Sequence, residues 1–322
     1  MIFLAASNSK KAPAKSDPNS FGAKVRLLFA GNNGYTLRKP MRQWWWLFMA
    51  PVTIAFCIGF VWPFIQGIYL SFCEFRALDD VKPIGVGNYI KVFNDKGFLH
   101  SFGLTALFAV TSLVIINILA FAVALALTSS MKGSNIFRTV FFMPNLIGGV
   151  VLGYIWTMIF DGILVNTPVN SIVNDPNWGF WGLIILVCWQ QIGYMMIIYI
   201  AGLNAIPGDL YEAARIDGAT GWQILWNVII PNVMPSITIC MFLSLTNGFK
   251  LFDQNLALTN GLPKEIADGA VVSQSELLAL NIVHTFKNTP GVAQAKGVLF
   301  FILVAALGLA QLGITRKREV QQ

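Results

Sequence analysis

The chain has 322 residues and a formal net charge of +7, and it is 56% hydrophobic but only 11% charged. Because soluble domains carry roughly a quarter charged residues, this composition predicts a polytopic membrane protein. The Lys and Arg residues lie mainly at the ends of apolar segments, whereas a nucleic-acid-binding protein shows them as a stripe on a soluble domain. We therefore expect no nucleic-acid partner.

The sequence contains no pattern that indicates catalysis. Four cysteines are scattered without a CxxC pair, and neither histidine has an acidic or Cys partner at the spacing of metal ligands. Both observations argue against a metal site. No G-x-x-x-x-G-K-[ST] run occurs, so the chain is not expected to bind and hydrolyse ATP by itself. We expect no catalytic residue, no metal and no cofactor in this chain.

Residues 1–43 are predicted to form a basic tail. The first 19 residues are rich in Lys, Ser, Pro and Asn and predict disorder. The segment from Phe21 to Gly31 fits either a short helix on the inner membrane surface or a plain linker.

Six segments are apolar enough to cross a membrane, which needs about 20 mostly apolar residues. The expected spans are 44–72, 101–128, 138–160, 180–203, 230–251 and 297–314. The sequence thus predicts an all-α polytopic protein. Its expected parts are a first transmembrane helix (44–72), an extracytoplasmic loop (73–100), a five-helix core (101–314) that contains a cytoplasmic loop (204–231), and a C-terminal tail (315–322).

The distribution of Lys and Arg predicts the orientation. The tail before Trp44, the connections 129–138 and 204–225 and the C-terminal tail together hold 14 of them, and the alternate connections hold 7. By the positive-inside rule, both termini are expected in the cytoplasm.

Polar and aromatic residues within the spans are candidates for a substrate path, since such groups either join helices or line a path. They are Asn117, Gln190, Gln191, Tyr194, Asn247, Phe249 and Lys250. For any one of these residues alone, helix packing is the favoured interpretation, but as a set they indicate the fourth and fifth spans as the pore walls. The positive charge of Lys250 would suit an anionic substrate. Lys250 can also reach water at the outer interface or pair with Asp253 three residues later.

The loop between the fourth and fifth spans contains residues that typically start and end helices. They are a break at Pro207-Gly208, a capping box of Asp209 with Glu212, a stop at Gly218, a second capping box of Thr220 with Gln223, and an end at Pro231. These signals predict a compact helix, turn and helix on the cytoplasmic face, which suits docking into a groove on another protein.

The same loop resembles a known family motif. Glu212, Ala213, Ala214, Gly218 and Pro231 match the EAA loop of binding-protein-dependent ABC transporter permeases, although Val228 and Ile230 stand where the motif usually has Ile and Leu. Three further segments are similar to the carbohydrate branch of that family, the MalF-like or UgpA-like permeases: Pro83 to Phe93, Phe137 to Trp156 and Phe249 to Pro263.

This resemblance implies an ABC type I importer permease fold and a location in a bacterial or archaeal plasma membrane. It also implies partners: a second homologous permease, two ATP-binding subunits that hold ATP and Mg, an extracytoplasmic solute-binding protein, and a carbohydrate or related glycoside as substrate. The residues expected to couple to the ATPase are Glu212, Ala213, Ala214, Asp217, Gly218 and Pro231.

Three alternatives remain at this stage. An importer for a glycerol-phosphate-type anion would use Lys250. A self-contained secondary transporter is disfavoured because the sequence shows no obvious repeat and no Asp or Glu inside the spans. In a membrane scaffold or assembly factor, the EAA loop would serve only to bind another protein.

Overall fold

The computed structural model describes residues 38–76, 80–128, 133–267 and 270–316. Most of the predicted tail, including the segment from Phe21 to Gly31, lies outside these ranges, as does most of the predicted C-terminal tail. The chain divides into two units, Met1–Gln66 and Gly67–Gln322.

The first unit contains the predicted first span. Helix α2 (Arg38–Phe56) continues through a π-helical turn (Cys57–Val61) into α3 (Trp62–Ser71), which runs on into the second unit. The segment Trp45–Ser71 is long and apolar enough to cross a membrane, and no residue of its most apolar window is buried. A helix of sufficient length and apolar composition thus occupies the position of the predicted span 44–72.

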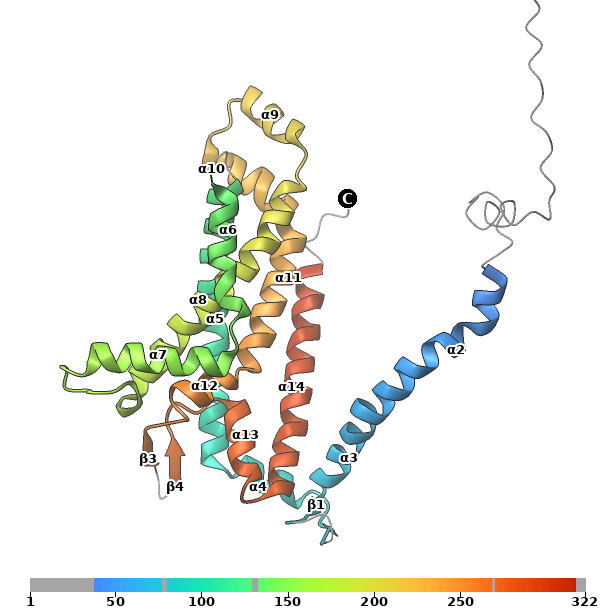
Figure 1. Cartoon of the computed structure of the whole chain (residues 1–322), viewed down its shortest axis with the longest axis vertical. Helices are drawn as coiled ribbons and strands as arrows, with labels where there is room; N and C mark the ends of the chain where they lie inside the picture. The colour runs from blue at the N-terminus through green and yellow to red at the C-terminus, as the bar shows by residue number, and fades with distance from the viewer. Residues whose placement is uncertain (1–37, 77–79, 129–132, 268–269, 317–322) are drawn as a thin grey trace, which may run out of the picture. The chain divides into compact units, whose positions relative to one another are not determined.

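The second unit is a helical bundle (Figure 1). Its long helices are α5 (Lys96–Thr128), α8 (Pro176–Asn204), α11 (Ile230–Phe249) and α14 (Pro290–Arg316). The buried core lies mainly where α5, α8 and α11 meet, around residues such as Ile116, Met195 and Tyr199. The predicted spans 101–128, 180–203 and 230–251 fall on the first three of these helices. The sixth span begins at Pro290, seven residues before the predicted start at residue 297, because Lys296 is buried rather than exposed in a loop.

The predicted third span, 138–160, is wrong as a single helix. Helix α6 (Ser134–Phe142) passes through a 3-10 turn (Met143–Leu146) and is followed by α7 (Gly149–Leu164), and the pair is bent by 100°. Pro144 lies in the turn, and Ile147 and Gly148 are extended, so the helical hydrogen bonds stop there. The described residues thus hold five helices able to span a membrane, or six if the bent pair forms one span.

Small residues hold α7 against the short helix α12 (Asp253–Leu258). A Cβ atom at Gly149 would meet Asp253 and Gln254, and one at Gly153 would meet Ala257. One turn later, the Thr157 hydroxyl donates to the Gly153 carbonyl at 2.9 Å and also lies 3.3 Å from the carbonyl oxygens of Ala257 and Leu258. The backbones therefore approach closely, as in other small-residue helix contacts.

The segments expected as outer loops are folded. They contain strands β1 (Cys73–Glu74) and β2 (Lys82–Pro83), helix α4 (Gly87–Phe93), strands β3 (Lys264–Ala267) and β4 (Ala270–Ser273), and helix α13 (Leu278–Phe286). Each pair of strands is antiparallel. Figure 1 shows α4, α13 and the β3–β4 hairpin at one end of the bundle and the loop helix α9 (Gly208–Ile216) at the other.

The packing of α7 on α12 predicts unequal effects of two similar substitutions on the same helix. Gly153→Ala should lower stability by about 1–3 kcal/mol, because the new methyl group overpacks a contact with Ala257. Gly162→Ala, where nothing lies within 4 Å of the new atom, should be neutral or slightly stabilising. Thermal unfolding of the detergent-solubilised proteins measures both. Equal midpoints would contradict the assigned packing.

Candidate functional site

Helix α9 ends in a left-handed turn at Gly218, whose φ is +74°. The Ala219 amide donates to the Ala214 carbonyl at 3.0 Å, and the Gly218 amide donates to the Arg215 carbonyl at 3.1 Å. This pair of bonds is the Schellman motif, which favours glycine because a side chain at positive φ is strained. The predicted stop at Gly218 is confirmed, and Asp217 is the last residue before it.

Of the two predicted capping boxes, only the second is present. Thr220 caps helix α10 (Gly221–Ile224) through the Gln223 amide, and the Gln223 side chain accepts from the Thr220 amide at 2.7 Å. At the first helix the N-cap is Pro207, which makes no side-chain cap bond, and Asp209 lies inside the first turn. The extended backbone at Pro207 places the N-cap two residues before the predicted one.

Pro231 does not end the second helix, contrary to the prediction. Helix α10 passes through a π-helical turn (Leu225–Ile229) straight into α11, so that Gly221–Phe249 is one continuous spanning segment. Pro231 lies in the first turn of α11, where its missing amide follows the altered hydrogen bonding of the π turn. The second half of the hairpin is therefore the beginning of the fifth span.

The hairpin exposes both charged and apolar side chains. Of the predicted coupling residues, Glu212, Ala213, Asp217 and Gly218 are exposed, and Ala214 and Pro231 are half-buried. Beside them, Ile216 is 85% exposed and Trp222 is 68% exposed. The Trp222 ring lies 5.7 Å from that of Trp226, also exposed. An apolar patch of this kind, rimmed by carboxylates, is typical of a protein-binding surface.

Tyr211 anchors α9 to the rest of the bundle. It is half-buried and packs against the hydrophobic core, and this burial raises the pKa of its phenol above the usual value. Glu212, the next residue, points away from the core into solvent. The helix is thus attached to the bundle by one face and open on the other.

A polar cavity of about 380 Å³ lies where α8, α11 and α12 meet. Its lining comprises Gln191, Asn247, Lys250, Leu251, Phe252, Asp253 and Gln254. The Asn247 amide donates to the Gln191 side-chain oxygen at 3.4 Å. Three of the residues predicted for a substrate path, Gln191, Asn247 and Lys250, therefore surround one cavity.

Gln190 joins this cavity to the break between α6 and α7. Its amide nitrogen donates to the Ile147 carbonyl at 3.2 Å, and its oxygen accepts from the Gln254 amide at 2.7 Å. Because Ile147 belongs to neither helix, its carbonyl needs a partner of this kind in an apolar environment. Asp253 and Gln254 were missed as lining residues because their segment was expected to be loop. Their position directly after the apolar run of the fifth span is the signal that could have indicated them.

The remaining predicted path residues lie in the packed bundle. Asn117 donates to the Leu113 carbonyl at 2.7 Å and to the Ser244 hydroxyl at 3.1 Å, and it accepts from the Tyr199 hydroxyl at 2.6 Å. Tyr194 is half-buried against the core, and Phe249 is buried. These contacts favour helix packing for all three, and their place on a substrate path stays a prediction.

Lys250 is exposed, and among the described residues no ion pair joins it to Asp253, so the expected pairing is not formed.

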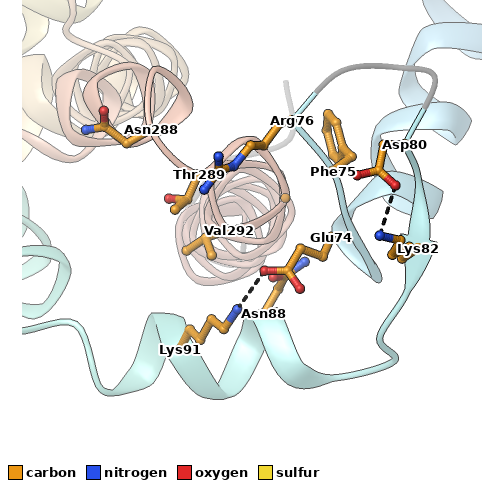
Figure 2. Close-up of a pocket in the computed structure, with 11 residues that line it drawn as sticks. Glu74, Phe75, Arg76, Asp80, Lys82, Asn88, Lys91, Asn288, Thr289 and Val292 are labelled. Atoms are coloured by element: carbon orange, nitrogen blue, oxygen red, sulfur yellow. Dashed lines mark hydrogen bonds and ion pairs between the residues drawn. The ribbon is translucent and has the colours of Figure 1, made fainter.

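Another polar pocket, of about 220 Å³, lies between β1, α4 and the start of α14. Figure 2 shows Glu74 facing Lys91 and Asp80 facing Lys82 in it, at 3.5 and 3.1 Å. Both of its ion pairs are exposed.

Comparison with known proteins places this fold in a class of membrane transport subunits. Residues 116–318 match the family described as binding-protein-dependent transport system inner membrane component. The chain belongs to this family, which comprises permease subunits of transporters and not enzymes. The predicted family and the all-α polytopic fold are confirmed.

Individual relatives cover nearly the whole chain. It is 40% identical, over 86% of its length and 96% of the relative's, to the probable starch degradation products transport system permease protein AmyD of Thermoanaerobacterium thermosulfurigenes. It is 29% identical, over 88% of its length and all of the relative's, to the multiple sugar-binding transport system permease protein MsmF of Streptococcus mutans. A solved bacterial ABC transporter for the import of alginate shares the fold, with a TM-score of 0.70 at 18% identity over 87% of this chain and 98% of that one.

Proposed function

We propose that this chain is one permease subunit of an ATP-driven importer for a sugar, an oligosaccharide or a related glycoside. It works with a second permease, two ATP-binding subunits and an extracytoplasmic solute-binding protein, in a plasma membrane with both termini in the cytoplasm. ATP and Mg bind to the partner ATPases. The observation that carries the proposal is that the capped hairpin around Gly218 follows α8 after three residues and runs directly into α11, the two helices whose amides line the polar cavity.

The continuity of these elements supports a mechanical role for the hairpin. The Schellman turn at Gly218 and the capping box at Thr220 fix α9 and α10 without the help of a partner. A groove that holds Ile216 and Trp222 would therefore move the hairpin as a rigid unit, and α8 and α11 with it. Glu212 supplies a charge that can pair with a basic group of the groove.

A neutral carbohydrate fits the cavity better than an anion does. Amide groups such as those of Gln191 and Asn247 hydrogen-bond hydroxyl groups as both donors and acceptors. Lys250 could attract an anion, but Asp253 lines the same cavity and opposes it. The names of the 40% and 29% identical relatives refer to starch products and sugars. Relatives named for sn-glycerol-3-phosphate transport are 28% identical.

The coupling role predicts separate losses at Glu212 and Gly218. Glu212→Ala should leave membrane insertion normal but weaken retention of the ATPase, since removal of one partner of a desolvated charge pair costs about 2–5 kcal/mol. Gly218→Leu should re-aim the hairpin, because a side chain at this positive φ is strained. The measurement is ATPase stimulation by the sugar-loaded binding protein in the purified complex. Glu265→Ala, an exposed carboxylate at the opposite end of the bundle, is the control. Normal stimulation in both variants at equal membrane abundance would make the hairpin a mere connector.

The substrate path predicts that Asn247→Leu and Gln191→Leu reduce sugar uptake by about tenfold, the factor that corresponds to one lost hydrogen bond of about 1.4 kcal/mol. Basal ATPase activity should change little. Thr246→Val is the matched control, because the Thr246 hydroxyl bonds only to the Phe242 and Leu243 carbonyls of its own helix. Uptake by vesicles that contain the reconstituted complex is the measurement. Normal uptake in both leucine variants would place the path elsewhere.

The orientation predicts opposite labelling of the start of α8 and the start of α10. In a background without native cysteines, Asn177→Cys should react with an impermeant maleimide applied to intact cells, and Gly221→Cys should react only after the membrane is opened. Both positions are exposed in the protein, so burial does not protect either. Labelling of the position 221 variant from outside would invert the topology and remove the basis for ATPase coupling.

A further inference from the structure

Lys296 is a completely buried charged residue in the second turn of α14, with 0% of its surface exposed. Its ammonium group donates three hydrogen bonds of 2.7 Å, to the Asp95 carboxylate, the Asn281 side-chain oxygen and the Thr285 hydroxyl. An ammonium group has three N–H donors, so all of them are satisfied. Lys296 therefore joins α14 to α13 and to the residue that precedes α5.

Glu276 is a second buried charge, 5% exposed, and lies next to this group. One carboxylate oxygen accepts from the Asn281 amide at 3.0 Å, and the other bonds to the His284 ring at 2.5 Å. The single amide of Asn281 thus links the two charges, with its oxygen on Lys296 and its nitrogen on Glu276. Each charge has partners that it requires in a buried site.

The segment that carries Glu276 is clamped to α12 on both sides. The Asn255 side chain donates to the Ser275 carbonyl at 2.8 Å and accepts from the Leu277 amide at 2.9 Å. Asn255 is fully buried, and the residue before it is Gln254, which lines the polar cavity and bonds to Gln190. A shift of residues 275–277 would therefore shift α12 and the cavity wall with it.

We propose that Lys296 and Glu276 are positioning residues of the substrate path. They hold residues 275–277 between α14 and α12, and so set the place of Gln254 against Gln190, although neither touches the cavity. Net stability is a poor explanation of such a cluster, since a buried ion pair often contributes no more than apolar residues of the same volume would. This proposal rests on the proposed function for the measurement of sugar uptake, whereas the measurement of cross-linking does not depend on it.

The test uses the assembled transporter without native cysteines, in which Gln190→Cys and Gln254→Cys are combined so that cross-linking reports the distance between α8 and α12. Adding Lys296→Met or Glu276→Gln should lower the cross-linking yield by about threefold or more, the size of coupling expected between interacting residues. In the transporter with native Gln190 and Gln254, the same two substitutions should lower uptake at saturating sugar by a similar factor. Lys91→Met is the matched control, because it breaks the exposed Lys91–Glu74 ion pair of α4, which lies at the same end of the bundle as α13 (Figure 1).

A second variant separates positioning from folding. Lys296→Met with Asp95→Asn leaves no unpaired carboxylate at position 95, and Asn can still accept from the Gly97 amide as Asp95 does at 2.9 Å. This double variant should recover membrane abundance but not the cross-linking yield. If the Lys296→Met protein fails to accumulate, the cross-linking yield of the double variant is measured in its place. Unchanged cross-linking in the double variant and in Glu276→Gln would overturn the proposal. Absence of sugar uptake by the unmodified complex would instead refute the proposed function and leave the cross-linking comparison intact.

Discussion

The main chain of α6 runs directly against α8 at Gly193, where a Cβ atom would overlap the backbone of Phe141 and Phe142. This contact holds the first half of the broken span on the bundle, and the contacts of Gly149 and Gly153 hold the second half on α12. Between the halves the backbone at Ile147 belongs to no helix. A broken span is tolerated only where other groups satisfy its backbone, and Gln190 does so here. The polar cavity and the broken helix therefore depend on each other.

The cavity and the cytoplasmic hairpin share their supporting helices. Gln191 lies 13 residues before the end of α8 at Asn204, which is about 20 Å at the rise of an α-helix. On the other side, α10 runs without a break into the helix that carries Asn247. Only the three residues 205–207 separate α8 from α9, and α10 is joined to α11 without a break, so a movement imposed on the hairpin has a short mechanical route to the cavity. The buried charges at Lys296 and Glu276 hold the third wall, α12, from the opposite end.

The parts of the fold that local chemistry determines could be predicted from the sequence. Apolar runs indicated the spans, and Gly218 and the pair Thr220 and Gln223 indicated the turn of the hairpin. Pro231 misled because a π turn, which no short pattern reveals, lets the helix continue through it. In the third span, Pro144 and the Gly148-Gly149 pair were a local signal of a break that the apolar run around them concealed.

The parts that depend on distant contacts could not be predicted. Gln190 and Gln254, 64 residues apart, form a pair only because α12 folds back on α7. Lys296 resembled a loop residue because its three acceptors lie between 11 and 201 residues away. For the candidate site, amides in the spans indicated the right helices, yet they did not separate Gln191, which lines the cavity, from Asn117, which joins helices.

The central claim is that a rigid hairpin transmits movement to the cavity, and the accessibility of the cavity in the complete complex tests it directly. The rate at which an impermeant thiol reagent modifies Asn247→Cys would be measured with the ATPases empty and with nucleotide trapped on them. The account predicts a nucleotide-dependent change in this rate that disappears when Gly218→Leu is added. An equal change with and without Gly218→Leu, in complexes that retain their ATPases, would contradict it.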